Sequence, residues 1–110
     1  MTEEEYAAAK REIDARMNDL LVEQTSLPRP VEPTTITPAS MAAYRLAVDR
    51  YCDYFDRLDA EFVATVAELA QLIRAAGDSS PGAQWWLRHC AEWQVEHAAL
   101  KAKDRPVIRH

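Results

Sequence analysis

Four closely spaced aspartates in the middle of the chain are the first side chains that could do chemistry: Asp49, Asp53, Asp56 and Asp59. Carboxylate oxygens bind Mg²⁺, with water completing the coordination. On a helix, however, the first three lie within about 60° of one another, at 100° per residue, and almost opposite the apolar positions. That placement is typical of the solvated face of an amphipathic helix. Because no second carboxylate motif accompanies them, we expect no metal site.

A cysteine and two histidines near the C-terminus are the next candidates for metal or nucleophile chemistry. Cys90 and His97 share a face of the predicted helix over 81–103, close to His89. They lie two turns apart, about 10.5 Å along the helix axis, so one zinc ion could not bind both without ligands from elsewhere. Cys52 is the only other thiol. We therefore expect Cys90 to pack in the core, as cysteines on apolar stripes usually do.

The sequence contains no motif that is typical of an enzyme. Nothing in it resembles a phosphate-binding loop, a nucleophile elbow or a zincin helix. The two glycines, Gly77 and Gly82, flank one turn, which leaves no glycine-rich loop to hold a phosphate. We predict no catalytic residue, no metal and no cofactor.

Three tryptophans, Trp85, Trp86 and Trp93, lie close together in the same predicted helix. Trp86 and Trp93 are seven residues apart and so share a face, which predicts that both lie in the core. Trp85 points about 100° away from Trp86, beside Arg88 and His89. A large aromatic side chain off the apolar stripe is typical of an interface anchor, so Trp85, Arg88 and His89 form the candidate partner interface. The alternative is that Trp85 packs against the neighbouring turn or the proline-rich segment.

Charge is unevenly distributed along a chain whose net charge is −5. Residues 1–24 are acidic overall, whereas four basic side chains near the C-terminus are the candidate contacts to a polyanion: Lys101, Lys103, Arg105 and Arg109. The opposite ends could pair within a dimer, or the basic end could contact nucleic acid. The acidic balance and the absence of interleaved aromatic residues make nucleic acid the less favoured partner.

The spacing of apolar residues predicts that helices position all of these side chains. Proline disfavours helical geometry in the residue before it and suits the first position of a helix. Glycine suits the left-handed conformation that ends one. The predicted order is a helix over 2–24, a proline-rich crossover over 25–38, a long helix over 38–76, a turn over 77–80, a helix over 81–103 and a tail over 104–110. The expected fold is an all-α single domain.

The long predicted helix carries an apolar seam in steps of three and four residues, as in a coiled coil. The residues of this seam expected to support self-association are Tyr44, Val48, Tyr51, Phe55, Leu58, Phe62, Val66, Leu69 and Ile73. The helix would span roughly 58 Å, whereas a compact chain of this length is only about 34 Å across. We expect the two shorter helices to pack along the seam. We also expect a second copy to associate with it, most simply as a twofold dimer.

Composition and cysteine usage indicate a soluble cytoplasmic protein. Hydrophobic residues make up 48% of the chain and charged residues 28%, which is ordinary for a globular domain. No apolar run approaches the roughly 18 residues of a membrane span, and the acidic first residues are unlike a signal peptide. Two cysteines cannot build a disulfide framework and suit a reducing compartment.

Arginine outnumbers lysine, and alanine fills many neutral helix positions, a bias that is typical of GC-rich genomes. In this respect the chain resembles the small helical accessory proteins of actinobacteria and their phages, which implies the host cytoplasm or the virion as its location. The resemblance is one of composition and transfers no functional residue. We expect a non-catalytic interaction or assembly protein that presents a helical surface to an unidentified protein partner. The alternative is a small nucleic-acid-associated regulatory protein that uses the basic C-terminal end.

Overall fold

The computed structural model describes residues 1–103, and these form three helices without a strand. Helix α1 spans Glu3–Thr25, α2 spans Pro38–Ala76 and α3 spans Pro81–Lys103. The predicted helices agree with these bounds to within one residue, and the all-α class is confirmed.

Local side-chain chemistry accounts for where the helices begin and end. The Thr2 hydroxyl accepts a hydrogen bond from the Glu5 amide at 3.1 Å and caps α1. At the start of α2, Thr37 and Ser40 cap each other's backbone amides, at 3.0 and 2.8 Å, which satisfies two amides that have no partner within the helix. Gly77 ends α2 with φ of 63°, a left-handed conformation that glycine adopts without steric cost.

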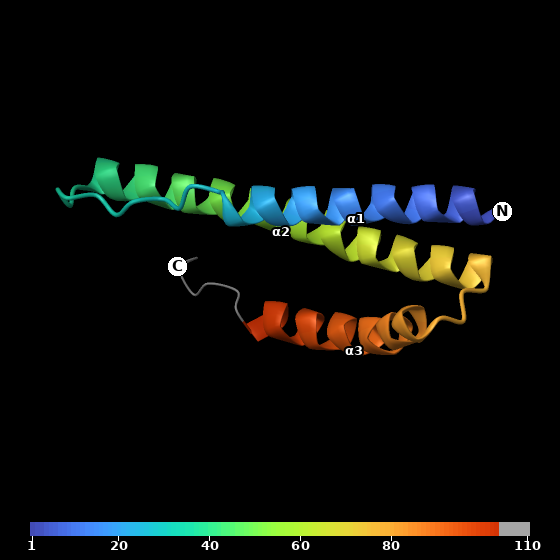
Figure 1. Cartoon of the computed structure of the whole chain (residues 1–110). Helices are drawn as coiled ribbons and strands as arrows, with labels where there is room; N and C mark the ends of the chain where they lie inside the picture. The colour runs from blue at the N-terminus through green and yellow to red at the C-terminus, as the bar shows by residue number, and fades with distance from the viewer. Residues whose placement is uncertain (104–110) are drawn as a thin grey trace.

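Helices α1 and α3 both run antiparallel to α2 and lie along its C-terminal half (Figure 1). The register of α1 is marked by two contacts: the Tyr6 hydroxyl donates to Asp78 Oδ2 at 2.6 Å, and Arg16 pairs with Glu68 at 2.7 Å. Hydrogen bonds from Tyr6 and Ser80 lower the pKa of Asp78 to about 2. Burial and the same hydrogen bond raise the pKa of Tyr6 to about 12. The contact therefore ties the start of α1 to the turn after α2.

The apolar core lies between the C-terminal half of α2 and the other two helices. One cluster of buried residues is formed by Ile13, Leu69, Ile73 and Ala83, and a neighbouring one by Val66, Ala70 and Cys90. Met17, Trp86 and Leu87 pack against both clusters. All three helices therefore contribute to one continuous core.

The N-terminal half of α2 extends beyond the ends of α1 and α3, and residues 26–37 run beside it (Figure 1). The molecule measures 62 × 25 × 16 Å and its radius of gyration is 18.9 Å, whereas a compact chain of this length would have about 13 Å. The prediction that the long helix exceeds the dimensions of a compact globule is confirmed.

Candidate functional site

An open apolar groove of about 300 Å³ lies between α3 and α2. Its lining comes from all three helices: Met17, Phe62, Val66, Trp85, Trp86, His89, Cys90 and Trp93. No charged carboxylate or ammonium group lines it, so it is suited to an apolar ligand surface rather than to an ionic one.

The seven-residue spacing of Trp86 and Trp93 directs both indoles toward α2, where they are half-buried. Trp93 meets Phe62 edge to face, with ring centroids 5.7 Å apart and planes at 70°, a favoured aromatic geometry. α3 packs less closely on α2 than α1 does, and the Trp93–Phe62 pair lies between the two helices. The groove is the space that this separation leaves.

Trp85 lies at the edge of the groove and leaves 54% of its surface exposed. Its indole stacks on the His89 imidazole, with centroids 4.2 Å apart, and His89 Nδ1 lies 2.8 Å from the carbonyl oxygen of Trp85. The structure thus holds Trp85 at the surface on a stacked partner of its own helix. Arg88 is exposed and does not line the groove.

Cys90 packs at the base of the groove, as predicted for a cysteine on the apolar stripe. Burial raises the pKa of its thiol, which keeps the sulfur in the protonated form that is a poor nucleophile and a poor metal ligand. His97 does not face Cys90 but turns to a carboxylate on α2. The two side chains therefore do not form a joint site.

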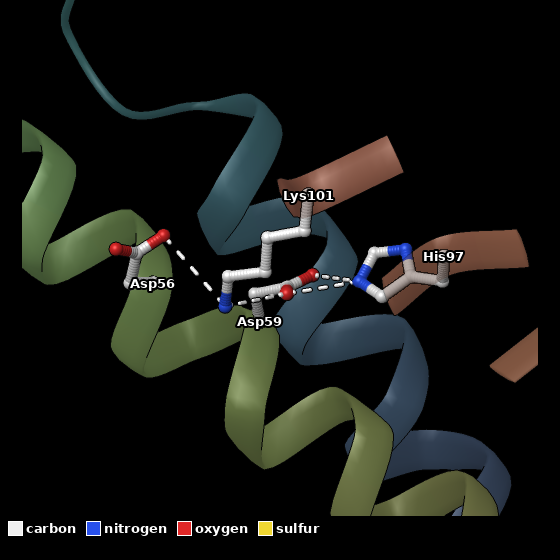
Figure 2. A network of polar contacts seen from close by, with 4 residues as sticks. All are labelled: Asp56, Asp59, His97 and Lys101. Atoms are coloured by element: carbon white, nitrogen blue, oxygen red, sulfur yellow. Dashed lines mark hydrogen bonds and ion pairs between the residues drawn. The ribbon is translucent and has the colours of Figure 1, made fainter. Parts of the chain in front are cut away.

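That carboxylate belongs to Asp59, which is buried under α3 with 6% of its surface exposed. His97 Nε2 lies 2.9 Å from Asp59 Oδ2, and Lys101 Nζ donates to the same oxygen at 3.1 Å. Lys101 also lies 3.7 Å from Asp56 Oδ1, so it bridges two carboxylates of α2 (Figure 2). The His97 ring stacks on Trp93 at 4.8 Å, which connects this polar cluster to the groove.

Two opposing effects act on the Asp59 carboxyl. Burial alone would raise its pKa, but the hydrogen bonds and charges of His97 and Lys101 outweigh burial and lower the pKa below its ordinary value. Asp59 is therefore ionised at neutral pH, and the Lys101 ammonium group of α3 supplies the opposite charge.

The predicted solvated face comprised Asp49, Asp53 and Asp56, and the fourth aspartate of the run, Asp59, is buried. Asp49 and Asp53 are exposed and Asp56 is half-buried. The step from Asp56 to Asp59 turns the side chain about 60° toward the apolar seam, which places Asp59 beneath α3. The sequence signal that we missed is the four-residue spacing of His97 and Lys101, which puts two nitrogen donors on one helix face.

The basic residues predicted to contact a polyanion are not equivalent in the structure. Lys101 is paired with Asp59 and Asp56, whereas Lys103 is exposed at the end of α3. Arg105 and Arg109 lie outside the described residues.

The apolar seam divides into two parts. Toward the C-terminal end of α2, the chain's own helices bury Leu58, Val66, Leu69 and Ile73, and Phe62 packs against Trp93. Toward the N-terminal end, Tyr44, Val48 and Tyr51 are partly exposed and Phe55 is 36% exposed. The prediction of self-association is thereby restricted to the N-terminal part of the seam.

Within residues 1–103, no three histidine, cysteine, aspartate or glutamate side chains gather as a metal site would require. None of the three described helices has a stretch that is both long and apolar enough to cross a membrane. Comparison of the chain with family models, with curated proteins and with solved structures found no match.

Proposed function

We propose that this chain is a non-catalytic interaction protein whose groove binds an apolar segment of a protein partner. The observation that carries the proposal is Trp85, a large aromatic side chain that stays 54% exposed at the edge of an apolar groove. Tryptophan is enriched among the residues that dominate binding energy at interfaces. An exposed apolar surface of this kind has a cost in solubility unless a partner uses it.

The groove favours a partner segment that carries large apolar side chains. Its indoles offer flat faces for stacking or edge contacts, and its volume is at the lower end of the range for ligand pockets. An amphipathic helix that places one or two apolar side chains between α2 and α3 would match this geometry. Exposed Arg88, next to the groove, would then contact the polar side of the segment.

Affinity capture from the source cells, with two matched variants, tests the proposal. Trp85→Ala removes the exposed indole, whereas Val95→Ala removes an apolar side chain of the same helix that is 71% exposed but outside the groove. We expect the wild-type chain and the Val95→Ala variant to retain the same partner and the Trp85→Ala variant to lose it. Circular dichroism should show equal helix content in all three proteins. A partner retained equally by all three would contradict the proposal.

A further inference from the structure

The face of α2 that packs on α3 continues toward the N-terminus without a covering helix. Eighteen residues make five helical turns at 100° per residue, so positions eighteen apart lie on the same face. The positions that face α3 are Asp59, Phe62, Val66, Ala70 and Ile73. Their counterparts five turns earlier, which we name the N-terminal face, are Met41, Tyr44, Val48, Cys52 and Phe55.

Helix α3 stops where the N-terminal face begins. Lys101, near the last residue of α3, already contacts Asp56 of α2. The first four residues of the N-terminal face are partly exposed and Phe55 is 36% exposed. None of the three described helices packs along the N-terminal half of α2, and only the segment 26–37 runs beside it (Figure 1). The N-terminal face is therefore an apolar, aromatic surface without a covering helix.

The amount of exposed surface favours a second copy of the chain as the occupant. The chain exposes 8181 Å², whereas a compact monomer of 12.5 kDa would expose about 6200 Å². This excess belongs to the elongated chain as a whole, and a standard interface would remove roughly 800 Å² per partner of it from solvent. A straight helical face with apolar residues at three- and four-residue steps fits an identical helix, because paired seams of this kind interdigitate.

Charge on the flank of the N-terminal face selects the orientation of the two copies. Arg45 and Asp49 are both exposed on the same flank, on either side of Val48 in the sequence. In an antiparallel pair with its twofold axis at Val48, Arg45 of each copy lies within one turn of Asp49 of the other. A parallel pair would instead place the two flanks that carry Arg45 and Asp49 on opposite sides of the interface, so these charges could not pair with each other across it.

We propose that two copies of this chain form an antiparallel dimer through their N-terminal faces, with Val48 on the twofold axis. Phe55 of one copy then packs opposite Met41 of the other, and α2 of the second copy begins near the point where α3 ends. α3 covers this face in the C-terminal half of α2, and the second copy covers the same face in the N-terminal half of α2. The groove at Trp85 lies outside this interface, so the dimer does not depend on the proposed partner.

Multi-angle light scattering on the purified full chain at about 100 μM tests the dimer. We expect twice the 12.5 kDa mass of one chain for the wild type and a single-chain mass for Val48→Asp. The control variant Leu46→Asp places the same charge on the opposite side of α2, at a residue that is 51% exposed, and should remain dimeric. A monomeric wild type, or a dimer that survives Val48→Asp, would overturn the proposal.

Exchanging the charges of Arg45 and Asp49 tests the antiparallel orientation without introducing a charge into the apolar interface. Arg45→Asp alone should weaken the dimer at low ionic strength, and the double variant Arg45→Asp with Asp49→Arg should restore it. Because both positions are exposed, these variants should keep the helix content of the wild type in circular dichroism. Failure of the double variant to recover dimerisation would overturn the antiparallel pairing.

Discussion

The buried environment of Asp59 is the feature at the residue scale that the sequence pattern did not predict. Helical periodicity gives the angle of a residue around its own helix, but it does not say which other helix lies above that angle. The partners of Asp59 come from residues 38 and 42 positions away, His97 and Lys101. Their nitrogen atoms could only be assigned to this carboxylate once the register of α3 on α2 was known.

The burial of Asp59 predicts unequal effects of two aspartate substitutions. Asp59→Ala removes the carboxylate that His97 and Lys101 contact and should lower the free energy of unfolding by about 1–3 kcal/mol. Asp53→Ala, on the exposed side of the same helix, should change it by less than about 0.5 kcal/mol. Urea denaturation at neutral pH and one protein concentration measures both values. Equal effects would show that the polar cluster does not contribute to stability.

The lowered pKa of Asp59 makes its contribution dependent on pH. A carboxyl whose pKa is lower in the folded than in the unfolded state stabilises the fold at pH values above its unfolded pKa of about 3.9. This stabilisation is lost as the pH falls through the folded pKa. The difference in unfolding free energy between wild type and Asp59→Ala should therefore shrink as the pH falls below about 5. Denaturation curves of both proteins across this range provide the test. A difference that grows with acidification would mean that the sign is wrong.

Helix ends were predictable because single residues determine them locally. Thr37 with Pro38 begins α2 and Gly77 ends it, and each acts through its own backbone geometry or through a residue three positions away. The coverage of the seam was not predictable in this way. Leu58 and Phe55 are consecutive members of the seam, yet Leu58 is buried and Phe55 is not, so the spacing that they share does not determine which of them is covered.

We expect alanine substitutions at the two glycines to change the stability of the chain in opposite directions. A Cβ atom at either position would meet no atom within 4 Å, but Gly77 has a left-handed φ of 63°. Gly77→Ala should therefore destabilise the chain by about 1–2 kcal/mol through backbone conformation alone. Gly82→Ala, within α3, should stabilise it by up to about 1 kcal/mol. Thermal denaturation of the two variants separates the effects, and a stabilised Gly77→Ala variant would contradict the assigned helix end.

The elongated shape of the whole molecule can be predicted from the sequence, whereas the groove cannot. A helix of 39 residues without an internal break must exceed the diameter of a compact chain of this length, and the structure extends 62 Å. The groove depends instead on how α3 is placed relative to α2, which only the three-dimensional packing shows. Spacing identified Trp85 as off the apolar stripe, but its exposure and its stacking on His89 required the structure.

Titration calorimetry with the partner obtained by affinity capture measures most directly whether the groove at Trp85 is a binding site. The Trp85→Ala variant should bind at least about 30-fold more weakly than the wild type, which corresponds to the roughly 2 kcal/mol of an interface anchor. The Val95→Ala variant, exposed on the same helix but outside the groove, should bind with the wild-type affinity. Equal affinities of the wild type and the Trp85→Ala variant would contradict the assignment of the groove as the partner site.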